Sequence, residues 1–213
     1  MGKDLQYRLR HKNGSWRILE STASTIKNER GDVEKLVIVN RDVTERVSAE
    51  EKLAHNALHD ALTDLPNRRL FLDRLQRCHA QVRRDPGYRY AVMLADIDGF
   101  KALNHSLGSA AGDQLLIEIG LRLQSSLRGA DEVGRPLSPG GEVLLARFGG
   151  DDFAFLLEGC ADGNDVLRLA ERAQAAVAAP LLLQQKLVRC TIGIGGAISS
   201  GSQARLDDTL QDA

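Results

Sequence analysis

Two pairs of aspartates stand where the chain changes direction. Asp96 and Asp98 follow the apolar run YAVMLA, which has the length of a buried strand. Asp151 and Asp152 follow a Gly-Gly pair between the strand-like runs VLLARF and FAFLLE. Carboxylate oxygens are the ligands that Mg²⁺ takes from proteins, usually one or two together with substrate phosphates. Either pair alone is typical of a solvated loop, so the hypothesis of a metal site depends on both pairs meeting at one edge of a sheet.

The glycines before the second pair have two interpretations. Gly149 and Gly150 lack Cβ atoms, which lets a phosphate approach the turn and allows positive φ angles. A tight hairpin needs such glycines without any ligand. These two residues alone therefore do not separate a binding turn from a structural one.

The elements that must position these residues alternate between helices and strands. Helical spacing of apolar residues occurs at 68–84, 116–127 and 165–178. Apolar runs typical of strands occur at 90–95, 143–148, 153–158 and 187–198. The run at 90–95 suits a central strand that is buried on both faces. This order predicts an α+β fold, with helices packed on a sheet.

The segment before residue 44 has a different pattern. Short β-rich runs are separated by turn signals at Asn13-Gly14 and at 28–32, which predicts antiparallel hairpins. Helix formers without Gly or Pro then predict a helix from about Thr44 to past Ala57. Its apolar seam has heptad spacing but small residues and a glutamate, so the helix is either a solvated linker or a signalling coiled coil.

Composition excludes several classes of protein. Lys and Arg number 28 and Asp and Glu 29, so no net field attracts nucleic acid or an anionic membrane. The longest apolar stretch, at 175–183, contains Pro180 and is too short to span a membrane, and the N-terminus has no signal-peptide core. Cys78, Cys160 and Cys190 are far apart and odd in number, which indicates packing cysteines. We expect a cytoplasmic protein.

Four motifs then resemble, in the same order, the GGDEF domain of bacterial diguanylate cyclases. They read HDALTDLPNRRLF, DIDGFKALNHSLGSAAGD, RFGGDDF and CTIGIGGA. The resemblance covers residues 59–213 and implies a palm-like sheet of the nucleotidyl-cyclase type. It also implies an activity, the condensation of two GTP into cyclic di-GMP with release of pyrophosphate, which requires a homodimer because each GTP attacks the other.

A second resemblance covers residues 1–43. The runs KNGSW, GDV and DVTER are similar to the last three strands of a PAS sensor domain. Because nothing precedes Met1 to enclose a ligand, we expect no intact sensory pocket in this segment. Residues 44–58 are then the linker helix between the two parts.

The family resemblance implies roles for the acidic residues. Asp96 and the carbonyl of Ile97 would hold Mg²⁺, or Mn²⁺, together with Asp151. Asp152, where the family more often has Glu, would hold a second metal ion or help to activate the ribose 3′-hydroxyl. Aspartate is one methylene shorter than glutamate, and a misplacement of about 1 Å can cost about 100-fold in rate.

The resemblance also implies the residues that bind the nucleotide. Lys101 and the backbone N–H groups of Gly99, Phe100 and Lys101 would hold the β- and γ-phosphates, with Gly149 and Gly150 close to them. Asn104 and Asp113 would bind the guanine edge. A carboxylate can accept hydrogen bonds from both N1–H and the exocyclic amine of guanine, and adenine offers no such pair, so Asp113 should select GTP over ATP.

Other positions depart from the family pattern. Its product-inhibition motif, R-x-x-D, is matched only by Arg128 and Asp131, which lie about a dozen residues too early, so feedback inhibition is expected to be weak. Ser109 replaces the usual His. Family members continue with a helix that supplies a Lys and an Arg to the phosphates, and this chain ends first, so we expect it to be a weak or inactive catalyst as it stands.

Two other hypotheses compete with the cyclase. The domain could be a catalytically weak GTP-binding module that regulates an EAL phosphodiesterase located after it, or a purely structural dimerisation segment. The latter would not need Asp96, Lys101, Asn104, Asp113 and Asp151 together.

Overall fold

The computed structural model describes residues 5–85, 87–128, 142–160 and 162–199. The chain divides into two compact units, Met1–Ala57 and Leu58–Ala213, which are described separately. In the part that the structure describes, no helix is both long enough and apolar enough to cross a membrane.

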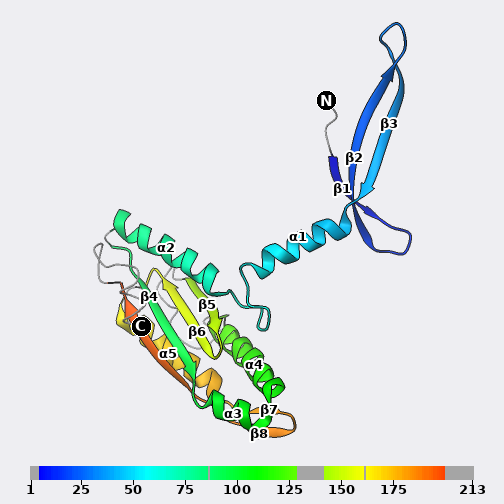
Figure 1. The fold of residues 1–213 in the computed structure, drawn as a ribbon. Coiled ribbons are helices and arrows are strands. Elements are labelled where there is room, and N and C mark those ends of the chain that lie inside the picture. The colour runs from blue at the N-terminus through cyan, green and yellow to red at the C-terminus, as the bar shows by residue number, and fades with distance from the viewer. Residues whose placement is uncertain (1–4, 86, 129–141, 161, 200–213) are drawn as a thin grey trace. The chain divides into compact units, whose positions relative to one another are not determined.

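The first unit is a three-stranded antiparallel sheet followed by one helix (Figure 1). Its strands are β1 (Leu5–Arg10), β2 (Trp16–Lys27) and β3 (Val33–Asp42), in that spatial order. The turn between β1 and β2 falls on the predicted Asn-Gly pair, so the hairpin prediction is confirmed. Helix α1 (Thr44–Asn56) has no buried residue, which leaves both the solvated linker and the coiled coil open.

The second unit is built on a four-stranded antiparallel sheet. Its spatial order is β5-β6-β4-β9, so β4 (Tyr90–Ile97) lies between β6 (Asp152–Glu158) and β9 (Ile192–Ile198), with β5 (Glu142–Gly149) at one edge. The side chains of β4 are buried almost throughout, which confirms the prediction of a central strand. Its last two residues, Asp96 and Ile97, still pair with β9, and the chain leaves the sheet after Ile97.

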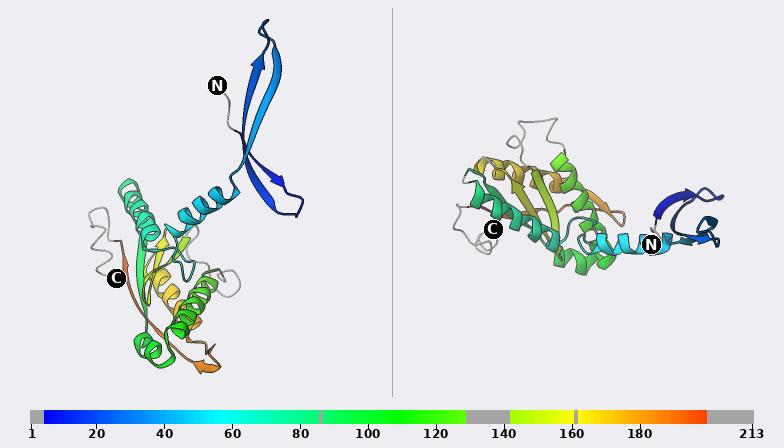
Figure 2. Two further views of the ribbon diagram at one scale, coloured as in Figure 1. Left: turned by 45° about the vertical axis from the view of Figure 1, so that its right-hand side comes forward. Right: turned by 90° about the horizontal axis from the view of Figure 1, so that it is seen from above.

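Helices cover both faces of this sheet (Figures 1 and 2). Helix α2 (Arg68–Arg84) buries Phe71, Leu75, Cys78 and Val82 against one face. Helices α4 (Ser109–Arg128) and α5 (Gly163–Ala178) pack on the other face, where Leu115, Ile119, Leu123, Leu169, Ala173 and Val177 meet the alternate residues of β4. The observed fold is the predicted α+β arrangement. All three cysteines are buried and free, as expected of packing residues.

One local prediction was wrong, and one short helix was not predicted. The run at 187–198 is not one strand: β8 (Lys186–Val188) pairs with β7 (Leu181–Leu183) in a separate hairpin, and β9 begins only at Ile192. Positive φ angles at Gln184 and Gln185 turn the chain there, a conformation that glutamine rarely adopts and that the sequence did not predict. The short helix α3 (Phe100–Leu107) was also missed, because eight residues give too little periodicity.

Candidate active site

The end of β4 carries the first predicted carboxylates. Asp96 is exposed near the end of the strand, Ile97 is buried, and Asp98 is tied to the start of β9. The Asp98 N–H donates to the Thr191 carbonyl at 3.0 Å, and the Thr191 hydroxyl donates to Asp98 Oδ2 at 2.5 Å. Gly99 then takes a left-handed φ of 71° and begins α3, which exposes Lys101 in the first helical turn. The two bonds with Thr191 therefore anchor the β4–α3 connection at Asp98.

The second pair lies in the β5–β6 hairpin. Gly149 and Gly150 have φ angles of 132° and 56°, and Gly149 pairs with Asp152 across the turn. A residue with a Cβ would be strained in either conformation. Asp151 is half-buried in the turn and Asp152 is exposed at the start of β6. The glycines therefore serve a structural purpose, and their exposure leaves room for a phosphate as well.

Arg147 holds the β5–β6 hairpin in place through its buried side chain. Only 8% of the residue is exposed, and its Nε and Nη2 donate to the Gly150 carbonyl at 3.2 and 2.7 Å. Its Nη1 donates to Asp60 Oδ1 at 2.7 Å. The backbone N–H of Arg147 donates to the Pro66 carbonyl at 2.9 Å. One buried side chain thus connects the Gly149-Gly150 turn to a segment more than 80 residues earlier.

That segment, residues 58–67, is called the entry turn below. Asp60 Oδ1 also accepts from the Thr63 N–H at 2.9 Å and from the Thr63 hydroxyl at 2.7 Å. Burial raises the pKa of Asp60, but hydrogen bonds from Thr63 and Arg147 outweigh it, so the net pKa lies below the ordinary value. The sequence prediction assigned no role to Asp60 or Arg147. The available signal was an arginine inside the otherwise apolar run VLLARF.

The carboxylates of the two pairs do approach one another. Although Asp96 is exposed, partial desolvation raises its pKa, and the carboxylates of Asp151, Asp152 and Asp98 raise it further. Asp96 and Asp152 both line a cavity of about 330 Å³ on the sheet, beside Phe148 and Gly193. Negative charges gathered in this way favour a cation between them.

The carboxylates of Asp96 and Asp151 fit a magnesium ion that is held partly by the protein and partly by the phosphates of a substrate. In the described ranges, no group of three or more His, Cys, Asp or Glu side chains is placed to hold a metal ion. Mg²⁺ usually takes one or two carboxylates from a protein when phosphates complete its shell, and the neighbouring carboxylates of Asp96 and Asp151 nevertheless supply two. The fit therefore requires the nucleotide as well as the protein.

The predicted guanine residues lie across the junction of α3 and α4. Gly108 is the single residue between these helices, and its N–H donates to the Asn104 carbonyl at 3.0 Å. Asn104 is half-buried, and its Oδ1 is buried without a hydrogen-bond partner among the described residues. Asp113 is exposed near the start of α4, directly after the buried Gly112. A buried acceptor without a partner, together with an exposed carboxylate on the adjoining helix, suits a ligand with several N–H donors.

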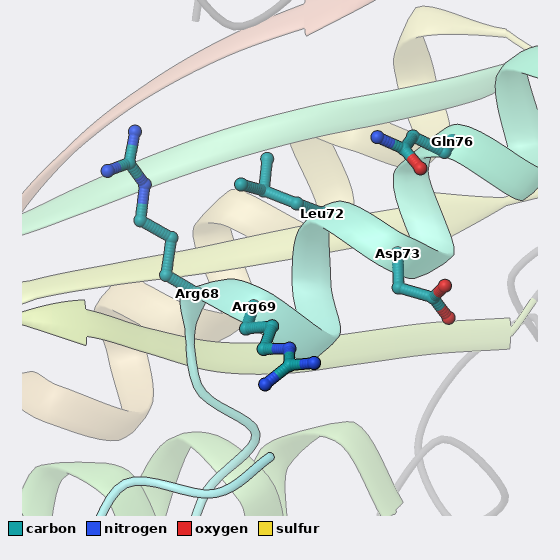
Figure 3. A pocket seen from close by; sticks show the side chains of 5 residues that line it. All are labelled: Arg68, Arg69, Leu72, Asp73 and Gln76. Carbon is teal, nitrogen blue, oxygen red and sulfur yellow. The ribbon is translucent and has the colours of Figure 1, made fainter. Parts of the chain in front are cut away.

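A second hollow runs along α2, away from the predicted site residues. It is lined by Arg68, Arg69, Leu72, Asp73 and Gln76, and Figure 3 shows the two arginines pointing to different sides of the helix. The Arg68 guanidinium lies 5.7 Å from the centre of the Phe148 ring, which is also in edge contact with Phe71. Phe148 comes directly before Gly149 and Gly150, so its contacts with Arg68 and Phe71 help to hold the β5–β6 hairpin.

Only one residue of the predicted product-inhibition pair lies in the described part of the chain. Arg128 is the last residue of α4, and Asp131 lies outside the described residues.

Comparison with known proteins identifies the family. The model of the diguanylate cyclase GGDEF domain matches residues 57–213, and the model of the PAS fold matches residues 2–40. The chain therefore belongs to the GGDEF family, with part of a PAS fold before the GGDEF domain.

Individual relatives agree with this assignment. The chain is 41% identical over 149 residues to the diguanylate cyclase TpbB of Pseudomonas aeruginosa, covering 68% of this chain and 31% of TpbB. It is 33% identical over 210 residues to the diguanylate cyclase DgcM of Escherichia coli, covering 94% of this chain and 46% of DgcM. The solved GGDEF domain of TpbB has 36% identity and a TM-score of 0.59, covering 72% of this chain and 85% of that one. The chain thus spans less than half the length of either curated relative.

Proposed function

We propose that this chain is the catalytic part of a diguanylate cyclase, which joins two GTP molecules into cyclic di-GMP and releases two pyrophosphates. The observation that carries the proposal is the approach of Asp96, at the end of β4, to Asp151 in the β5–β6 hairpin. Two further features support it, the exposed α3 N-terminus with Lys101 and the orphaned Asn104 oxygen beside Asp113.

The proposed reaction is an in-line displacement at the α-phosphorus. The 3′-oxygen of one GTP forms a bond to the α-phosphorus of the other, the α–β phosphoanhydride bond breaks, and pyrophosphate leaves with its electron pair. The 3′-hydroxyl proton passes to a base. Asp152, exposed at the start of β6, either accepts this proton or helps to hold a second cation. Repetition by the other GTP closes the ring.

The residues of this chain divide the remaining tasks. Asp96, the Ile97 carbonyl and Asp151 would hold Mg²⁺ or Mn²⁺. The metal ion, when bound, would stabilise charge on the phosphates and lower the pKa of the 3′-hydroxyl. Lys101 and the backbone N–H groups at the start of α3 hold the β- and γ-phosphates. Gly149 and Gly150 let the triphosphate lie close to the hairpin because they carry no side chains.

The proposed substrate preference depends on Asn104 and Asp113. The Asp113 carboxylate accepts hydrogen bonds from N1–H and the exocyclic amine of guanine, whereas adenine lacks this pair of donors. Each copy of the domain binds one GTP, so turnover requires an isologous dimer that faces two nucleotides toward one another. Residues 1–43 are the PAS part, 44–58 the linker helix and 59–213 the cyclase domain in this proposal.

The experiment is incubation of the protein with GTP and Mg²⁺, with the products separated by chromatography. We expect cyclic di-GMP and pyrophosphate in a 1:2 ratio, formed slowly because this chain is expected to be a weak catalyst, with a rate that depends on protein concentration because a dimer is needed. Asp151→Asn should abolish the product while the circular dichroism spectrum stays unchanged. The formation of GDP and phosphate alone, or equal turnover in Asp151→Asn, would contradict the proposal.

A further inference from the structure

Gly112 is an unexpected residue at its position. It lies in the first turn of α4 and is buried. Glycine is less favourable than alanine inside a helix, because it loses more conformational freedom when the helix forms. A helical, buried glycine therefore points to a neighbour that leaves no room for a side chain.

That neighbour is the carboxamide of Asn104. A Cβ atom on Gly112 would lie 2.6 Å from Asn104 Oδ1, 3.0 Å from Asn104 Cγ and 3.4 Å from Cζ of Phe100. The first distance is too short for non-bonded atoms, and the second is tighter than most real Cβ contacts. The Phe100 ring closes another side of the same space and packs against the core. The carboxamide could escape a Cβ only by rotating about its own side-chain bonds.

Such a rotation would change what Asn104 presents to a ligand. Its Oδ1 is buried and has no hydrogen-bond partner in the described part of the chain, so no internal bond fixes the carboxamide. The space that a Gly112 side chain would fill is the space that the carboxamide borders, so the missing Cβ is what lets it lie there. Asp113, the other proposed guanine residue, is bonded directly to Gly112, with Cα atoms about 3.8 Å apart.

We infer that Gly112 is a positioning residue for guanine recognition: the missing side chain keeps the Asn104 carboxamide in place beside Asp113. The inference rests on the proposed function, because it presumes that these two residues bind guanine. Gly112 itself would not touch the base. Any side chain at position 112 would weaken the binding of guanine nucleotides and leave that of adenine nucleotides nearly unchanged.

The test is calorimetric binding of GDP and of ADP, each with Mg²⁺, to the whole chain and to Gly112→Ala. GDP is used because it cannot be converted to the cyclic product. Loss of one hydrogen bond in the variant should weaken GDP binding about three- to tenfold. Gly120→Ala is the matched control, since Gly120 is buried on the same helix and its Cβ would meet Leu65 Cδ1 at 3.2 Å. This control should keep the ratio of GDP to ADP affinity.

A second comparison separates positioning from a general loss of stability. In an Asn104→Ala background the clash is gone, so adding Gly112→Ala should leave GDP affinity unchanged and should not lower Tm. An equal loss of GDP and ADP affinity in Gly112→Ala, or an unchanged GDP affinity, would overturn the inference. If the original chain itself binds GDP no better than ADP, the proposed guanine site is wrong, and the inference falls with it.

Discussion

The contact between Asp60 and Arg147 leads to the most direct test of how the site is held. Asp60→Ala removes the carboxylate that receives one bond from Arg147 and two from Thr63. The guanidinium would keep its bonds to the Gly150 carbonyl but lose its counter-charge. Because the side chain of Arg147 is only 9% exposed, water can replace that partner only in part.

The expected cost can be estimated from these bonds. A hydrogen bond to a charged group contributes about 1.5–3 kcal/mol, and the local bonds within the entry turn add about 1 kcal/mol. The Asp60 side chain is 22% exposed, which reduces the sum. We expect Asp60→Ala to lower the free energy of unfolding of the second unit by about 2–4 kcal/mol. Asp60→Asn keeps the shape and an acceptor and should cost about half as much.

Urea unfolding followed by far-UV circular dichroism measures the change. Trp16 is the one tryptophan in the sequence and lies in the first unit, so the midpoint of its fluorescence change should stay the same. Asp73→Ala is the matched control, because it breaks an exposed ion pair with Arg77 and should cost under about 1 kcal/mol. Equal losses in Asp60→Ala and Asp73→Ala would refute the reasoning that burial makes this bridge important.

The same pair predicts a pH dependence of defined sign. The folded-state pKa of Asp60 is lower than its value in the unfolded chain, so the carboxylate adds stability above the unfolded pKa, about 3.9. This stability is lost as the pH falls through the folded pKa. The stability difference between the unaltered chain and Asp60→Asn should therefore be constant from pH 7 to about 5 and shrink below about pH 4. A difference that grows toward low pH would contradict the assignment.

Three further outcomes are expected. Burial raises the pKa of Cys78 to about 12, so iodoacetamide at pH 8 should leave this thiol unmodified in the folded chain and alkylate it in urea, as mass spectrometry can show. Gly149→Ala should lower stability by about 1–3 kcal/mol in urea titration, because its φ of 132° is strained for alanine; a neutral change would mean that the hairpin can rearrange. Thr191→Val should raise the KM for GTP more than it lowers kcat, because it frees the Asp98 end of the β4–α3 loop while the metal ligands stay; an unchanged KM in steady-state kinetics would remove that loop from nucleotide binding.

The sequence was most informative where hydrophobic periodicity and fixed spacing coincide. The α2 range and the buried β4 strand followed from apolar patterns that each element expresses within its own residues. The approach of Asp96 to Asp151 followed from their placement at the ends of neighbouring strands. The β7–β8 hairpin did not follow, because it turns on two glutamines with positive φ angles, a conformation that glutamine rarely adopts.

What the sequence could not indicate is how the site is supported, because the supporting contacts join distant segments. Asp60 and Arg147 each have an ordinary solvated interpretation in isolation, and only the fold shows that they share a buried bond. Gly112 likewise becomes informative only when the space around it is measured. In both cases the residue acts through a neighbour: Arg147 holds the Gly150 carbonyl of the hairpin turn, and Gly112, in the inference above, leaves the space beside the Asn104 carboxamide open. Since a displacement of about 1 Å in such a neighbour can cost about 100-fold in rate, substitutions at these two positions should alter activity more than their distance from the phosphates suggests.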